Sequence, residues 1–153
     1  MSYTAFTIGV FIIVSLINSY LDFRTFHISL ILNYIGLVIC VVAIFIIAPS
    51  LLLNKTAGGV LLFLLFVLIR LLTHNGLGLG DIHYCLFCGF IAGCPGFIIC
   101  SLISSLSGIF YFLFIRLILK KEDAFKTRIP FIPMMFLGTL VGMPVSTYLI
   151  NIL

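Results

Sequence analysis

The sequence predicts an all-α membrane protein, a polytopic transmembrane helical bundle of about six spans. Of its 153 residues, 63% are hydrophobic and only 8% are charged, and the mean hydropathy is +1.40. Soluble domains are about 45–50% apolar and about 25% charged, so this composition excludes an ordinary soluble protein. Residues 1–153 are therefore expected to form one integral-membrane domain in a lipid bilayer, with no soluble domain.

Apolar runs separated by charged residues, Gly and Pro place six helices along the chain. They cover residues 4–21, 29–49, 57–73, 82–94, 97–118 and 131–150. The first run has no basic segment before it and no small-residue cleavage site, which favours a retained span over a removed signal peptide. The fourth run is short against the roughly 20 residues that a crossing needs. Because "CPG" at 94–96 fits either a tight turn or a kink, five spans is the alternative.

Basic residues set the expected orientation. With six spans, only Lys55 lies on one side of the membrane, and the other side holds the remaining basic residues: Arg24, Arg70, Arg116, Lys120, Lys121, Lys126 and Arg128. Cytoplasmic loops carry an excess of Lys and Arg, so that side is predicted to be cytoplasmic and both termini to lie outside the cytoplasm. The net charge of +4 is scattered between apolar runs and does not form one basic face, so no nucleic acid partner is expected.

Two of the four acidic residues lie at the ends of apolar runs on the predicted cytoplasmic side. Asp22 ends the first span and Asp81 begins the fourth, so the topology places them at the same depth. Each alone is compatible with a helix cap or a solvated side chain. Together, two carboxyl groups a few ångströms apart resist double ionisation and share a proton. One then acts as a base towards water and the other as an acid, which is aspartic protease chemistry without a metal or cofactor.

The segment "GLGLGD" at 76–81 places three glycines directly before Asp81. Glycine adopts backbone conformations closed to other residues and allows another backbone to approach closely. An extended substrate pairing its main chain along Gly78 and Gly80 would use both properties. The plain alternative is a flexible turn between helices.

Three stretches in order along the chain resemble the type IV prepilin peptidases and the related archaeal preflagellin peptidases. They are "DFRTFHI" (22–28), "GLGD" (78–81) and "IPFIPMMFLG" (129–138). The resemblance implies a membrane aspartyl endopeptidase with Asp22 and Asp81 as its catalytic pair. It also implies a multi-pass protein of the prokaryotic cytoplasmic membrane, with its active site facing the cytoplasm. The implied partner is a prepilin-like precursor whose short basic leader is cleaved.

Several details depart from that family. Ile82-His83 follows the GxGD motif where Val-Lys is common, and Ser29-Leu30 stands where Pro-Asn is often found. The cysteine-rich domain of members that also N-methylate their product is missing. The resemblance is therefore to small stand-alone peptidases without methyltransferase activity.

Other residues near the acids have supporting or alternative interpretations. Arg24 is expected either to favour the ionised form of Asp22 or to extend to the membrane interface. Pro130 and Pro133 predict an irregular start to the last span that frames the substrate cleft. His27, His74 and His83 raise a metalloprotease as an alternative, but no H-E-x-x-H is present and Cys85 and Cys88 form a lone CxxC, so no metal site is expected.

Two functions of other classes remain as alternatives. One is a small proton- or cation-coupled transporter that uses the two aspartates, although such proteins favour acids near the bilayer midplane and internal repeats. The other is a catalytically inactive assembly factor of a secretion system that retains the fold.

Overall fold

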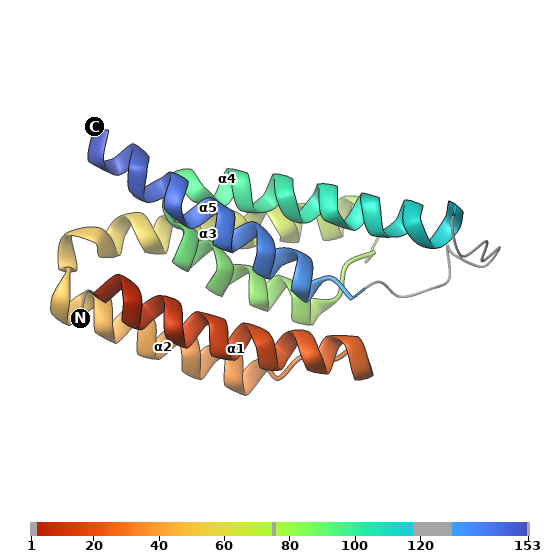
Figure 1. Cartoon of the computed structure of the whole chain (residues 1–153), viewed down its shortest axis with the longest axis horizontal. Helices are drawn as coiled ribbons and strands as arrows, with labels where there is room; N and C mark the ends of the chain where they lie inside the picture. The colour runs from red at the N-terminus through yellow and green to blue at the C-terminus, as the bar shows by residue number, and fades with distance from the viewer. Residues whose placement is uncertain (1–2, 75, 118–129, 153) are drawn as a thin grey trace.

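The computed structural model describes residues 3–74, 76–117 and 130–152, all of which are helical or lie in short connections (Figure 1). The elements in chain order are α1 (Tyr3–Thr25), α2 (Leu30–Ile47), the short 3-10 helix η1 (Pro49–Leu51), α3 (Leu52–Leu72), α4 (Leu79–Leu117) and α5 (Ile132–Ile152). The predicted loop at 120–128, with its four basic residues and with Glu122 and Asp123, lies outside the described residues.

The helices form an elongated bundle whose two ends differ. The start of α1 and the end of α5 lie at one end, whereas the end of α1 and the starts of α4 and α5 lie at the other (Figure 1). The second end carries the residues that the sequence identifies as functional. It is called the site end below.

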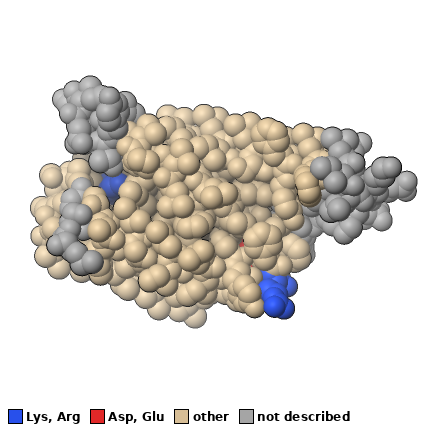
Figure 2. All heavy atoms as spheres, viewed as in Figure 1, with Lys and Arg blue, Asp and Glu red and all other residues tan. Residues whose placement is uncertain are grey.

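Helix length and composition agree with a membrane protein. Within the described residues, four helical segments are long and apolar enough to cross a bilayer: Thr4–Thr25, Leu30–Ile47, Pro49–Leu72 and Leu79–Phe114, with a shorter apolar helix at Ile132–Val145. Large apolar side chains cover the outside, among them Leu53 at 81% exposed and Ile31 at 76%. Figure 2 shows a face that is almost free of charged side chains. Such a surface suits lipid and not water.

The fourth and fifth predicted helices form one element, α4, that is broken at Gly93. This residue has φ 78° and ψ 174°, a region open to glycine alone. The two parts of α4 run in opposite directions from that point, so that both its ends lie towards the site end (Figure 1). The break falls one residue before the predicted "CPG", and Pro95 lies in the first turn of the second part, where proline is tolerated.

Two polar side chains of α3 satisfy the backbone groups that the break exposes. The Lys55 ammonium donates to the Ile91 carbonyl at 2.7 Å, and the Cys94 N–H donates to Asn54 Oδ1 at 2.7 Å. An unpaired backbone group in hydrocarbon costs several kcal/mol, so these bonds allow the chain to turn there. The prediction that this helix starts at residue 57 is wrong, because polar Asn54 and Lys55 lie inside α3, which starts at Leu52.

Glycines let α3, α4 and α5 pack closely. A Cβ placed on Gly58 of α3 would lie 2.7 Å from the Gly89 carbonyl oxygen of α4. A Cβ on Gly142 of α5 would lie 2.7 Å from the Gly96 carbonyl oxygen. Small residues spaced four apart are a common device for contact between membrane helices. They bring α5, and with it the start of that helix, against α4.

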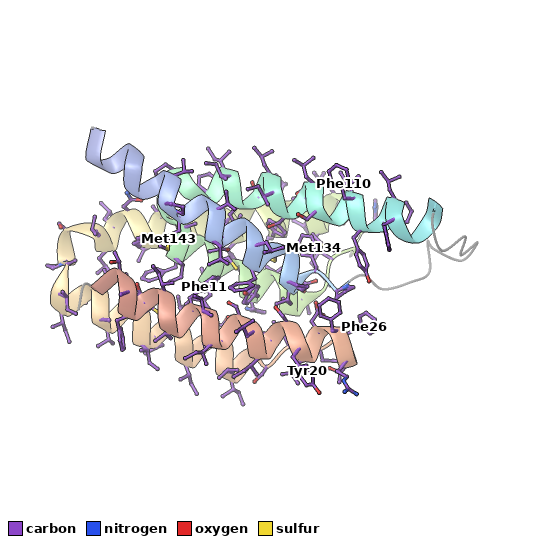
Figure 3. The ribbon with its side chains drawn as sticks, in the orientation of Figure 1. Phe11, Tyr20, Phe26, Phe110, Met134 and Met143 are labelled. Carbon is purple, nitrogen blue, oxygen red and sulfur yellow. The ribbon has the colours of Figure 1, made fainter. Side chains whose placement is uncertain are left out.

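The remaining helix, α1, joins the bundle through aromatic and polar contacts. Phe11 points from α1 into the bundle, 5.2 Å from the Phe87 ring and 5.7 Å from the Phe136 ring (Figure 3). One turn further along, the fully buried Tyr84 hydroxyl of α4 donates to Ser15 Oγ at 2.6 Å. These contacts fix the face of α1 that carries Asp22 against α4 and α5.

Candidate active site

Asp22 lies in the last turns of α1, and its carboxylate meets the start of α5. The side chain is only 5% exposed, and Oδ2 accepts a hydrogen bond from the Ile132 N–H at 3.1 Å. The backbone of Phe131 provides a second bond. The first N–H groups of a helix have no partner within the helix, so Asp22 satisfies donors of α5 from another part of the chain. The prediction ended the first helix at residue 21, but α1 continues to Thr25 and carries Asp22 within it.

Asp81 lies in the first turn of α4 and binds the residue that opens the helix. Gly78 accepts the first helical bond, from the Ile82 N–H at 3.4 Å. The Asp81 carboxylate in turn accepts a hydrogen bond from the backbone of Gly78. This is the carboxylate half of a capping box, in which the third helical residue reaches back to the residue before the helix. The sequence Gly-x-Gly-Asp therefore fixes the carboxylate locally.

The two carboxyl groups, 59 positions apart in the sequence, lie close enough to interact electrostatically. Asp22 is buried and Asp81 is partly exposed. Two like charges in a poorly hydrated place repel, so protonation of one carboxyl group lowers the energy of the pair. A pair in that state contains both a base and an acid.

The glycines of the GxGD segment matter because they lack a side chain, which leaves room for neighbouring atoms, and not because of unusual backbone angles. Among the described residues, Gly93 is the only glycine with positive φ. Gly78 and Gly80 therefore do not use the positive-φ conformations that glycine permits. A Cβ on Gly78 would lie 2.9 Å from Asp81 Oδ2, and one on Gly80 would lie 2.9 Å from Ile28 Cγ1. α4 begins at Leu79, so Gly80 lies in its first turn, and main-chain pairing of a substrate along Gly78 and Gly80 stays a prediction.

The supporting residues predicted from the sequence have different surroundings. The exposed Arg24 guanidinium lies over the ring of Tyr20 (Figure 3), 5.5 Å from its centroid. It does not form an ion pair with Asp22 among the described residues. Pro130 is buried beside the site, and Pro133 is half-buried in the first turn of α5. Met134 and Met135 both donate to the Phe131 carbonyl at 3.1 Å, a shared bond that is common at helix termini, and the irregular start expected from the prolines stays a prediction.

No hydrogen bond or ion pair joins any of the three histidines to Asp22 or Asp81 among the described residues. His27 and His74 are exposed. The His83 ring nitrogen Nδ1 lies 2.6 Å from the Tyr34 hydroxyl, which joins α4 to α2. No group of three or more His, Cys, Asp or Glu side chains that could hold a metal ion occurs among the described residues. Cys85, Cys88 and Cys100 are buried in α4.

Two polar residues near the pair, Asn18 and Ser19, were not singled out from the sequence, and Arg70 was interpreted only as a basic residue at the cytoplasmic end of the third span. Asn18 and Ser19 are buried on α1 within one turn of Asp22, and Asn18 Nδ2 and Ser19 Oγ have no hydrogen-bond partner. Arg70 at the end of α3 donates through its guanidinium to the Leu77 carbonyl, in the segment before Asp81. The spacing of Asn18, Ser19 and Asp22 along one helix face was a readable signal for the first two. Arg70 offered none, because its partner is a backbone atom.

One of three comparisons with known proteins identifies a family. A model of the type IV leader peptidase family matches residues 9–113, a segment that contains both Asp22 and Asp81. No curated protein and no solved structure matched the chain. The match covers more than two thirds of the sequence and includes the helices that bring the two carboxyl groups together. The chain belongs to the type IV leader peptidase family.

Proposed function

We propose that the protein is a membrane aspartyl endopeptidase that removes the short basic leader of prepilin-like precursors at the cytoplasmic face of the membrane. One observation supports the proposal: Asp22 at the end of α1 and Asp81 at the start of α4 lie at the site end of the bundle, near enough for the charge of Asp22 to act on Asp81, within the segment that matches the family. A pair of interacting carboxyl groups provides the acid and the base that hydrolysis of an amide needs.

The proposed reaction uses the shared proton of the pair. The ionised carboxylate removes a proton from water while the protonated carboxyl group donates its proton to the scissile carbonyl oxygen. Water oxygen bonds to the carbonyl carbon, which gives a neutral tetrahedral diol. As the diol collapses, the C–N bond breaks and the proton taken from water passes to the leaving nitrogen, while a diol hydroxyl returns its proton to the carboxylate that had acted as the acid. The pair again holds a single proton, and no covalent enzyme intermediate forms.

The surroundings of Asp22 suit it to the role of base. Its carboxylate faces N–H groups at the start of α5, where the partial positive charge of a helix N-terminus favours an anion. Asp81 accepts one backbone bond and is the proposed proton donor. The unpartnered donors Asn18 Nδ2 and Ser19 Oγ are available to water or to the substrate main chain nearby.

We also propose six crossings with the site end in the cytoplasm. The reversal of α4 at Gly93 supports two crossings by that element, although residues 79–92 extend only ~21 Å at 1.5 Å per residue. Arg24 and Arg70 lie near the site end, whereas Lys55 binds the break in α4 away from it. That distribution of charge favours a cytoplasmic site end and places both termini on the opposite side.

The substrate and the lack of methyltransferase activity are part of the same proposal. A cytoplasmic acid pair at the membrane surface suits a precursor whose basic leader stays in the cytoplasm while its apolar segment enters the bilayer. Cys85 and Cys88 are buried among helices, which suits packing and not a separate cysteine domain. We therefore propose peptidase activity alone.

The function is tested by co-expressing the protein with prepilin-like precursors from the same genome and sequencing the new N-termini by mass spectrometry. Asp22→Asn and Asp81→Asn are the informative variants, because an amide oxygen still accepts the backbone N–H bonds at each position but an amide cannot exchange the proton. We expect cleavage by the parent and loss of at least about 1000-fold in rate for each variant, with unchanged yield in the membrane. If either variant cleaves at the parental rate, that aspartate is not catalytic and its role is limited to capping a helix.

A further inference from the structure

Arg70 makes a contact that neither its helix nor the membrane interface requires. It lies in the last turn of α3, half-buried, and its guanidinium donates to the Leu77 carbonyl. A basic residue at this place commonly binds the last carbonyls of its own helix or extends to water. The end of α3 is instead closed by backbone bonds, from Thr73 N–H to the Ile69 carbonyl at 2.9 Å and from His74 N–H to the Leu71 carbonyl at 3.3 Å.

The peptide unit that Arg70 binds is the one that holds Asp81. The Leu77 carbonyl and the Gly78 N–H belong to the same planar peptide group, and that N–H is the backbone donor to the Asp81 carboxylate. In a trans peptide the C=O and N–H point in opposite directions, so a bond that fixes one fixes the other. The peptide group is thus held between a guanidinium on one side and a carboxylate on the other.

This arrangement affects both the direction and the strength of the bond to Asp81. The Gly76 N–H donates to the Thr73 carbonyl at 3.2 Å and the Gly78 carbonyl accepts from the Ile82 N–H at 3.4 Å, but neither bond includes the Leu77–Gly78 peptide group. A charged donor on the carbonyl also polarises the peptide, which strengthens the N–H as a donor by about 10–30% in chains of hydrogen bonds. Without Arg70, the Leu77 carbonyl loses this bond and the direction of the Gly78 N–H towards Asp81 is less restrained.

We propose that Arg70 is a positioning residue that orients Asp81 through the Leu77–Gly78 peptide. The inference rests on the proposed peptidase function and adds a residue from a third helix to it. Arg70 touches neither the scissile bond nor the partner aspartate in this scheme. Its effect therefore appears in the rate of the chemical step and not in substrate binding.

The test compares Arg70→Met and Arg70→Lys in a cleavage assay of the purified full-length protein, with the precursor that the parent cleaves best. Methionine keeps the apolar stem but donates no hydrogen bond, so we expect kcat to fall roughly 10- to 100-fold with KM changed less than about twofold. Lysine keeps the charge and a donor, so kcat should recover to within about fivefold of the parent. Rescue by lysine separates a role of the donor from a role of side-chain volume.

A matched control is His74→Asn, in the same connection between α3 and α4. The His74 side chain is exposed and its backbone has φ 50°, which asparagine tolerates. This variant should keep parental kcat. Equal unfolding midpoints in detergent for all variants establish that rates are compared between folded proteins.

The outcomes separate the two proposals. Parental kcat in Arg70→Met, or equal losses in the Met and Lys variants, would overturn the role of Arg70 while the peptidase function stands. Retained cleavage in Asp81→Asn, run beside them, would overturn the function itself. An increase in KM alone for Arg70→Met would assign the residue to substrate binding and contradict the positioning role.

Discussion

Both aspartates of the site meet the N-terminal end of a helix, but they reach it by different routes. Asp81 binds back within its own helix to Gly78, whereas Asp22 crosses from α1 to the start of α5. The first arrangement is local and is encoded in four consecutive residues. The second depends on the packing of α1 against α4 and α5, which places the carboxylate beside the Ile132 N–H.

Gly78 controls the position of the Asp81 carboxylate. A methyl group at this position would lie 2.9 Å from Oδ2, so the carboxylate must rotate away in Gly78→Ala. We expect kcat to fall roughly 10- to 100-fold with little loss of stability, because the end of a side chain moves and not the backbone. Gly108→Ala is the control, since a Cβ there has only ordinary contacts of 3.5 Å or more. Parental activity in Gly78→Ala would show that this glycine has no part in placing Asp81.

The sequence predicted the acids at the site better than it predicted their environment. Their place at the ends of apolar runs, on one side of the membrane, was readable from hydropathy and charge. The contacts of Asp22, Arg70 and Asn54 could not be predicted in this way, because each side chain binds a backbone group outside its own helix. Nearly every residue has the same backbone N–H and C=O groups, so a sequence pattern does not identify which of them a distant side chain will bind.

The break in α4 at Gly93 reverses the direction of the chain between the fourth and fifth predicted helices. The conformation of Gly93 lies in a region where a side chain costs about 1–3 kcal/mol. Gly93→Ala should lower the free energy of unfolding in detergent by at least that amount, since Gly58 of α3 also packs there. In Gly9→Ala, a Cβ meets nothing within 4 Å, and alanine favours a helix, so stability should be equal or up to ~1 kcal/mol higher. Equal stability of the Gly93 and Gly9 variants would contradict the proposed turn.

Helix positions were predictable to within a few residues for most elements. The helices predicted at 29–49 and 131–150 agree closely with the observed α2 at Leu30–Ile47 and α5 at Ile132–Ile152. Errors arose where polar residues belong to a helix, as for Asn54 in α3 and Asp22 in α1, because hydropathy alone excludes them. The repeats Gly89-x-x-x-Gly93 and Gly138-x-x-x-Gly142 were a signal for close packing that hydropathy does not use.

The bundle as a whole has a site end and an opposite end, and its proposed orientation can be measured. Exposed Thr25 lies at the end of α1, near the site, and exposed Ser50 lies in η1, between α2 and α3. In a background with Cys94→Ser, we expect Ser50→Cys to react with an impermeant maleimide on intact cells. Thr25→Cys should react only after the membrane is opened. The reverse pattern would place the acid pair outside the cytoplasm and contradict the proposed substrate.

Asp22 and Asp81 are proposed to act as one unit, and a comparison of single and double variants in the same cleavage assay tests this. Groups that act together in one step lose nearly all their effect when either is changed. We expect Asp22→Asn, Asp81→Asn and the double variant to share the same residual rate within about tenfold. Losses that multiply in the double variant, or one single variant with parental rate, would contradict it.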